Sequence, residues 1–189
     1  PVFNKVKNIP LLDKVIEAFG FSTKREMPEV QNITPLKEIY KTQPTFEKKV
    51  ILLADTFNIN FEVKNIMYAI KVLNKFGFQA IIPSFDDNNL SRPLCCGRTY
   101  ISYGQMDKAK FEMNRVANYL YNNGYAEMPV VGIEPSCLLT LNDEFKALKG
   151  IENRDKLKNK FYLIEEFILE QIKEGNKVSA HAYNKNVLV

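Results

Sequence analysis

Three cysteines are the residues of this chain best suited to chemistry. Cys95 and Cys96 are adjacent, and Gly97 permits the tight turn that would aim both sulfurs inward. Cys137 follows Pro135 within the first turn of an expected helix, where free N–H groups favour a thiolate. An odd number of cysteines is a poor disulfide framework and favours a reducing compartment. We therefore expect a cytoplasmic protein whose cysteines bind metal, exchange electrons or are simply buried.

Other polar residues flank the cysteines or follow an early apolar run. Arg98 would place a positive charge beside the adjacent pair, and Glu134 and Ser136 precede the third cysteine. Asp55 and Thr56 come directly after the apolar run. Ligands of open parallel sheets bind outside the carboxyl ends of the strands. We therefore expect these residues and the cysteines at one edge of a sheet.

The elements that must position these residues alternate between apolar runs and amphipathic segments. This pattern predicts an α/β fold with a mainly parallel, Rossmann-like sheet flanked by helices. Strands are expected over 49–55, 78–83 and 128–133, and helices over 11–19, 63–76, 105–122, 135–150 and 154–174. Two helical core faces are expected to carry Val63, Ile66, Met67, Ile70, Leu73 and Phe76, and Ala109, Met113, Val116, Ala117 and Leu120. The last helix is expected to bury Leu157, Phe161, Ile164, Phe167, Ile168 and Ile172.

The chain is expected to divide into three parts. Residues 1–48 would form an irregular lead-in, in which a short helix precedes an extended segment with three prolines. Residues 49–175 would form the α/β domain. Residues 176–189 would open a further repeat that is cut short, and the proline at position 1 suggests a cut or processed N-terminus.

Composition and charge exclude several classes of function. The chain has 189 residues, of which 46% are hydrophobic, and a net charge of +4 with its lysines widely spread. Without a basic stripe or a nucleic-acid-binding motif, we expect no nucleic-acid partner. No apolar run approaches the ~20 residues that span a bilayer, so we expect no transmembrane segment. No GxGxxG, P-loop or GxSxG motif supports nucleotide binding or serine hydrolysis.

Some further residues are assigned no chemistry. The single histidine, His181, is expected at the surface rather than in a metal site. Asp86 and Asp87 indicate a solvated loop, and Gly104 and Gly124 indicate turns.

Three segments resemble the cysteine-rich CCG domain of iron–sulfur oxidoreductases: VILLADTFNINFE, LCCGRTYISYGQMDKAK and VVGIEPSCLLTLNDEF. They look most similar to the C-terminal iron–sulfur region of fused FAD-linked oxidases of D-2-hydroxy acids, of the D-lactate and D-2-hydroxyglutarate dehydrogenase type. With KREMPEV in the lead-in, the resemblance covers about residues 1–150. CCGR and EPSCLLTL are more specific together than either motif alone.

The resemblance implies a set of metal ligands. The family pattern has a cysteine after the first strand, then CCG, then CxxC, and it holds an iron–sulfur cluster or zinc. Cys95 and Cys96 match the CCG pair, and Cys137 matches the last cysteine of CxxC. The first cysteine is missing from the segment that starts at Asp55, and Glu134 replaces the first member of CxxC. A cubane iron–sulfur cluster requires four cysteine thiolates. A zinc site with three sulfurs could instead be completed by Asp55, by Glu134 or by water.

The resemblance also implies a redox module that passes electrons from a flavin to an acceptor. FAD is expected in another domain of the full-length protein, and the partners would be that flavin domain and a second CCG repeat. The fragment alone is therefore not expected to oxidise substrate, and peripheral membrane association of the full-length protein stays open. Two alternatives also stay open: a degenerate repeat that acts as a scaffold, and a metal-free thiol-redox site.

Overall fold

The structure of the chain is a computed structural model that describes residues 10–20, 22, 28–86, 90, 92–158 and 160–176. The expected further repeat therefore lies outside the described residues, except for its first residue, and so do His181 and Asp87. Within these ranges, every helix is too short or too polar to cross a membrane.

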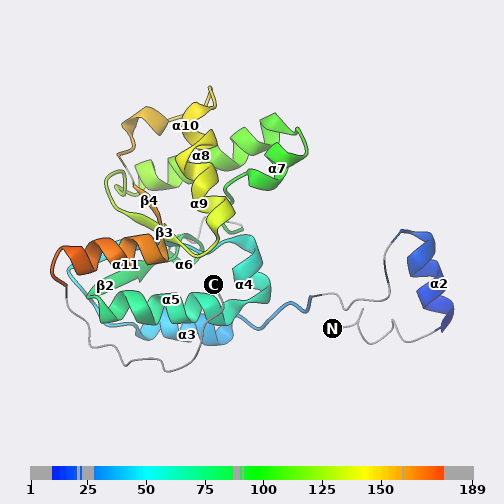
Figure 1. Cartoon of the computed structure of the whole chain (residues 1–189), viewed down its shortest axis with the longest axis horizontal. Helices are drawn as coiled ribbons and strands as arrows, with labels where there is room; N and C mark the ends of the chain where they lie inside the picture. The colour runs from blue at the N-terminus through cyan, green and yellow to red at the C-terminus, as the bar shows by residue number, and fades with distance from the viewer. Residues whose placement is uncertain are drawn as a thin grey trace.

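Four parallel strands form one sheet in the order β2-β1-β3-β4 (Figure 1). They are β1 (Lys48–Leu53), β2 (Phe78–Ile81), β3 (Val130–Gly132) and β4 (Phe161–Leu163). The first three strands coincide with the three apolar runs rich in β-formers, as predicted. The expected α/β fold with a parallel sheet is therefore confirmed, and β4 extends the sheet beyond the prediction.

One face of the sheet is covered by three helices. These are α3 (Thr34–Thr42), α5 (Val63–Lys75) and α11 (Ile164–Lys173), which pack around Val50 and Leu52 of the central strand β1. Four expected core residues of α5 are buried, and the other two are half-buried: Val63, Ile66, Ile70 and Leu73, then Met67 and Phe76. Alternate residues of β1 point to opposite faces, so the same strand also supports a second core.

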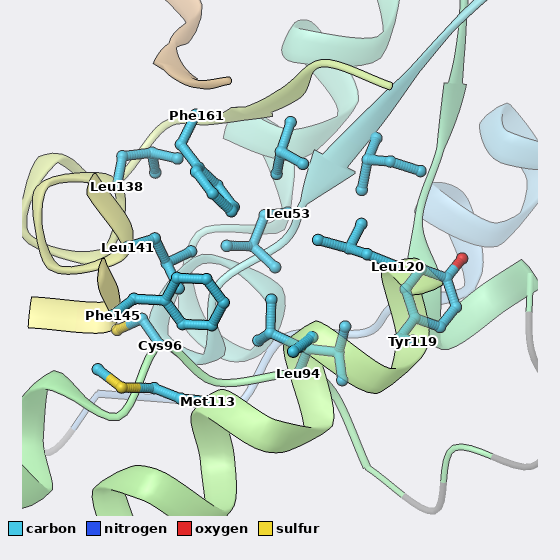
Figure 2. Close-up of a cluster of buried hydrophobic side chains, with 14 of the residues drawn as sticks. Leu53, Leu94, Cys96, Met113, Tyr119, Leu120, Leu138, Leu141, Phe145 and Phe161 are labelled. Carbon is cyan, nitrogen blue, oxygen red and sulfur yellow. The ribbon is translucent and has the colours of Figure 1, made fainter. Parts of the chain in front are cut away.

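The second core lies on the opposite face. Here α8 (Met106–Asn122), α9 (Pro135–Asn142) and α10 (Glu144–Ala147) pack around Ile51 and Leu53. Figure 2 shows part of this cluster, in which Cys96 lies among apolar side chains from several elements. The expected core face of α8 is fully buried: Ala109, Met113, Val116, Ala117 and Leu120.

The predicted helix over 154–174 is wrong in its first half. A short 3-10 turn at Arg154–Lys156 is followed by strand β4, and only then does α11 begin. Phe161 pairs with Val130 of β3 and packs against Phe145. Apolar residues spaced three or four apart fit a helix, but a short run of aromatic residues fits a strand equally well. Sheet pairing decides between them, and Ile172, expected inside, is 54% exposed.

The extended lead-in is also corrected. Its first helix, expected over 11–19, is observed as α2 (Pro10–Ala18), which stands apart from the domain in Figure 1. The segment expected to be extended contains α3, which has a proline in its first turn and packs on α5. Leu36 of α3 is completely buried. Proline is tolerated in the first turn of a helix, so it does not argue against α3.

Short helices occupy the loops near the carboxyl edge of the sheet. α4 (Thr56–Phe61) follows β1, α6 (Pro83–Asp86) follows β2, and α7 (Arg98–Ser102) follows the cysteine pair. The single helix predicted over 135–150 is divided into α9 and α10 at Asp143. These loops deliver the polar residues to the edge where a site was expected.

Candidate functional site

The residues expected to do chemistry surround one pocket of about 630 Å³. Its walls include these expected residues: Asp55, Thr56, Cys95, Cys96, Arg98, Glu134, Ser136 and Cys137. Gly97 and Pro135 do not line the pocket, but they begin the helices α7 and α9 as N-cap and first residue. Folding of a parallel sheet therefore brings together three segments that are far apart in the sequence.

The sulfurs of Cys96 and Cys137 are in contact. The Sγ atoms of Cys96 and Cys137 lie 3.0 Å apart. Cys96 is only 3% exposed, whereas Cys137 is half-buried in the first turn of α9. The S–S bond of a disulfide is about 2.05 Å long. The two sulfurs would therefore have to move about one ångström closer together to form a disulfide.

Cys95 lies beside a turn that only glycine tolerates well. Gly97 has a φ of 81°, and its N–H lies 3.5 Å from the Cys95 sulfur. A Cβ atom on Gly97 would lie 2.9 Å from the carbonyl oxygen of Ala109. Both the backbone conformation and the close approach to α8 thus require glycine. Arg98 begins α7 immediately afterwards and donates to the Ser102 hydroxyl.

The local environment favours protonated thiols. The hydrogen bond with Cys96, and then burial, raise the pKa of Cys95 well above its usual range. The hydrogen bond with Cys137 is the main cause that raises the pKa of Cys96 to about 12, and burial adds to it. Cys95 and Cys96 are therefore protonated at neutral pH, and a metal ion would have to displace these protons in order to bind.

Asp55, the first residue after strand β1 and Ala54, caps a helix. One carboxylate oxygen accepts hydrogen bonds from the backbone N–H groups of Phe57, at 3.0 Å, and Asn58, at 2.9 Å. The other oxygen accepts from the Asn58 side-chain amide at 2.6 Å. The carboxylate is thus committed to the first turn of α4, where orphan N–H groups need acceptors. It is only 5% exposed.

Glu134, at the second position where a cysteine is missing, has the same role at α9. Its carboxylate accepts from the backbone N–H of Ser136 at 3.2 Å and from the Ser136 hydroxyl at 2.8 Å. Pro135 occupies the first helical position, where its lack of an N–H costs nothing. An acidic N-cap therefore stands at both of these strand ends.

The side chains around the pocket do not form a complete metal site within the part of the chain that the structure describes. Three sulfurs cannot supply the four thiolates of an ordinary iron–sulfur cluster. Both candidate carboxylates are already engaged in helix capping. Among the residues that the structure describes, no group of three or more His, Cys, Asp or Glu side chains is arranged to hold a metal ion. Further ligands would have to come from elsewhere.

An ion-pair network supports the pocket and was not expected from the sequence. Glu112 of α8 is 2% exposed and lines the pocket. It accepts hydrogen bonds from Arg92 and, at 2.9 Å, from Arg115. Arg115 also donates to the backbone carbonyls of Arg92, at 2.7 Å, and Pro93, at 3.1 Å. The network therefore fastens the chain just before the cysteine pair to α8.

A sequence signal for this network does exist. Glu112 lies between Ala109 and Met113 on the apolar face of α8, where a charged residue needs a partner.

Three other residues were expected only in a loop or in turns: Asp86, Gly104 and Gly124. Asp86 accepts hydrogen bonds from the hydroxyls of Tyr119, at 2.9 Å, and Tyr125, at 3.1 Å, so it does more than face solvent. The predicted turns at 104 and 124 are confirmed by φ values of 69° and 73°.

Comparison with known proteins finds partial similarities to D-2-hydroxyglutarate dehydrogenases. The chain is 24% identical over 121 residues to the D-2-hydroxyglutarate dehydrogenase of Pantoea ananatis (strain AJ13355), which is 64% of this chain and 11% of that protein. It is 23% identical over 105 residues to the D-2-hydroxyglutarate dehydrogenase of Escherichia coli (strain K12), which is 56% of this chain and 10% of that protein. The match thus spans about a tenth of each relative. No family model matches the chain, and no solved structure matches it significantly.

Proposed function

We propose, on the premise of a distant relationship to D-2-hydroxyglutarate dehydrogenases, that this chain is a redox module of a flavin-linked oxidoreductase of D-2-hydroxy acids. The partial similarities support an oxidoreductase-associated role. The observation that carries the finer proposal is the convergence of Cys95, Cys96 and Cys137 on one pocket. The FAD would belong to another domain or partner, from which this module would accept electrons.

Two kinds of metal group could use the three sulfurs together with outside ligands, and only one of them would carry electrons. An iron–sulfur cluster would carry single electrons, whereas zinc would only organise the pocket. Either metal would use the three cysteines and would need further ligands, which a second CCG repeat or another partner would have to supply. Within this chain, the cysteines would hold the group, and the network around Glu112 would keep the loop in place.

A metal-free carrier is the second candidate, and the 3.0 Å contact between Cys96 and Cys137 specifically favours it. In this reaction a reduced flavin would give two electrons and two protons to the Cys96–Cys137 disulfide. The S–S bond would break, two thiols would form, and the flavin would be oxidised. Cys95 would remain a thiol throughout.

The test compares metal content with thiol content. Protein purified without oxygen would be assayed for iron, zinc and acid-labile sulfide, and its thiols counted after equilibration in glutathione buffers of graded potential. Iron and sulfide with absorbance near ~400 nm would identify a cluster. Reversible loss of two thiols without metal would identify the disulfide carrier, with the bond mapped by peptide mass.

Matched serine variants separate these outcomes. Cys95→Ser should leave the disulfide carrier intact, whereas Cys96→Ser and Cys137→Ser should each abolish it. A cluster would be disturbed by all three changes. Protein that binds no metal and keeps all three thiols reduced at every potential would contradict the redox proposal, and the domain would then be a scaffold.

A further inference from the structure

An apolar groove lies between α5 and α11, on the face of the sheet away from α8. Its volume is about 790 Å³. Four of its large side chains are substantially exposed: Tyr68 (59%), Val72 (37%), Leu169 (51%) and Ile172 (54%). A contiguous group of exposed apolar residues marks an interaction site. A volume of this size is also typical of sites that bind small molecules.

The two helices that form the groove run in the same direction (Figure 1). α11 begins directly after β4, and α5 follows β1 through the short helix α4. Because β1 and β4 belong to one parallel sheet, both helices begin at its carboxyl edge and run back along the same face. Corresponding turns of the two helices therefore form the two walls of the groove at the same height.

The groove is polar at the carboxyl edge of the sheet and mainly apolar along the rest of its length. Asn65 and Glu165 line it in the first turns of α5 and α11. Mainly apolar residues follow in the next two turns, as far as Val72 and Ile172. The rise from Asn65 to Val72 is ~10.5 Å, and the rise from Glu165 to Ile172 is the same. The groove therefore fits a molecule that has one polar end and an apolar chain.

The polar end of the groove offers hydrogen-bond acceptors. The Asn58 side-chain amide donates to the Asp55 carboxylate at 2.6 Å, and its own oxygen accepts from the Asn65 amide at 2.9 Å. This chain turns an N–H group of each amide toward Asp55 and leaves the Asn65 oxygen at its outer end. The Glu165 carboxylate is a second acceptor, on the α11 side of the groove. A head group that donates a hydrogen bond, such as a hydroxyl, suits this end.

The charges at the groove disfavour an anionic head group. Of the charged side chains on α5 and α11, both of which the structure describes completely, Glu165 lines the groove. The others do not line it: Lys64, Lys71, Lys75, Glu166, Glu170 and Lys173. The N-terminus of α11 would attract an anion, but Glu165 and Glu166 in its first turn already offset its partial positive charge. A hydroxyl therefore fits this end better than a carboxylate.

We propose that this groove binds a small amphipathic molecule of the long-chain alcohol class. Its hydroxyl donates to Asn65 or Glu165 at the carboxyl edge of the sheet. Its apolar chain lies along Tyr68, Val72 and Leu169, and burial of this chain supplies most of the affinity. The groove includes none of the three cysteines, so this binding does not depend on the redox function proposed above.

Titration of the full chain with octyl compounds, followed by NMR of its methyl groups, tests this proposal. Octanol should bind saturably and shift the methyl signals of Val72, Leu169 and Ile172. Octanoate has an anionic head, and should bind roughly 10-fold more weakly because Glu165 repels it. Leu169→Glu should weaken octanol binding by about 10-fold or more. The matched control is Phe111→Glu on α8, because Phe111 is 59% exposed and lies outside the groove, and it should leave binding unchanged.

Glu165→Gln tests the assignment of the head group. The substitution removes the charge but keeps an acceptor, so octanol should bind about as before, whereas octanoate should gain roughly 10-fold. An octanol titration that does not saturate, or that shifts only signals away from the groove, would overturn the proposal. So would an unchanged ratio of the two affinities in Glu165→Gln, because the groove would then be an apolar surface without a polar end, as a protein partner would use. Circular dichroism spectra that match the wild type would establish that the variants fold.

Discussion

Glu112 ties the chain just before the cysteine pair to α8 without a hydrogen bond to either sulfur of the pair. Its carboxylate joins α8 to Arg92, and Arg115 extends the connection to the backbone at Pro93. A buried carboxylate is costly unless it is paired, and removing one member of such a pair leaves the others uncompensated. The pocket thus depends on a buried charge in its own wall.

Replacement of Glu112 by glutamine should therefore destabilise the fold by about 3 kcal/mol, because Arg115 would lose its anionic partner. Urea unfolding followed by circular dichroism would measure the loss. The control is Glu127→Gln, which breaks an ion pair with Lys158 that lies on the exposed surface. This control should leave the free energy of unfolding almost unchanged. Equal effects of the two substitutions would contradict the role assigned to the buried network.

Gly97 offers a second test at the scale of single residues. Gly97→Ala should cost about 2 to 3 kcal/mol, because it combines a positive φ with a close approach to Ala109. Gly104 has a φ of 69° but open space around the position of a Cβ atom. Gly104→Ala should therefore lower the free energy of unfolding by only about 1 kcal/mol. Urea midpoints of the two variants provide the comparison. If Gly97→Ala proved no worse than its control, the contact with Ala109 would be unimportant.

The candidate residues were predictable from the sequence, but their contacts were not. Cysteines that follow apolar runs were expected to meet at one edge, because parallel strands place their carboxyl ends together. Which two sulfurs touch depends on the path of the loop before Cys95, and the Glu112 network holds that path. The capping roles of Asp55 and Glu134 were also missed, although Asp before a helix is a usual N-cap signal.

At the scale of elements, side chains take up backbone groups along the outer edge of β2. The Gln43 amide accepts from the backbone N–H of Ala80 at 3.0 Å and donates to the Ala80 carbonyl at 2.9 Å. It thus imitates the next strand of the sheet. Unpaired edge strands invite pairing with other chains, so Gln43 protects the molecule as well as stabilising it.

Gln43→Ala should therefore destabilise the chain by about 1 to 3 kcal/mol. It should also increase aggregation, which light scattering during slow heating would detect. Lys41→Ala, two residues earlier on exposed surface, is the matched control and should change neither property. A Gln43→Ala protein with unaltered stability and scattering would show that water replaces the amide without cost.

Helices and strands were predicted correctly where the apolar residues followed a single clear periodicity. α5 and α8 have long apolar stripes, and β1 is a continuous run of β-formers, so each was predicted close to its observed place. β4 was missed because its three residues also fit the helical stripe that continues into α11. α3 was missed because the prolines around it suggested an extended segment, whereas Leu36 is buried in the core that α3 shares with α5 and the sheet. Both errors concern segments whose structure is decided by a partner distant in the sequence.

At the scale of the whole molecule, alkaline pH should weaken the fold. Burial is the main cause that raises the pKa of Tyr125 to about 12, and the Asp86 charge adds to it. Burial and Asp86 likewise raise the pKa of Tyr119 well above its usual value. Because these folded-state values exceed the unfolded value of about 10, the hydroxyls contribute stability that is complete below pH ~10 and is lost as the pH rises further.

Unfolding in urea at pH 8 and pH 11 would measure this loss. The free energy of unfolding should be lower at pH 11 in the wild type. In Tyr119→Phe the free energy of unfolding should depend less on pH, because one of the hydroxyls with a raised pKa is absent, although the variant starts from a lower stability. A pH dependence that is unchanged in Tyr119→Phe would assign the alkaline loss to other groups.

The contact between Cys96 and Cys137 has a consequence for the lifetime of the molecule. The two residues are 41 positions apart in the sequence. A covalent bond between them would tie α9 to the loop before α7 and remove about 4 kcal/mol of chain entropy from the unfolded state. The oxidised form would then open less often than the reduced form and would resist proteases longer. In a cell, the rate at which proteases degrade this chain would thus depend on the redox state of its surroundings, whether or not a metal carries its electrons.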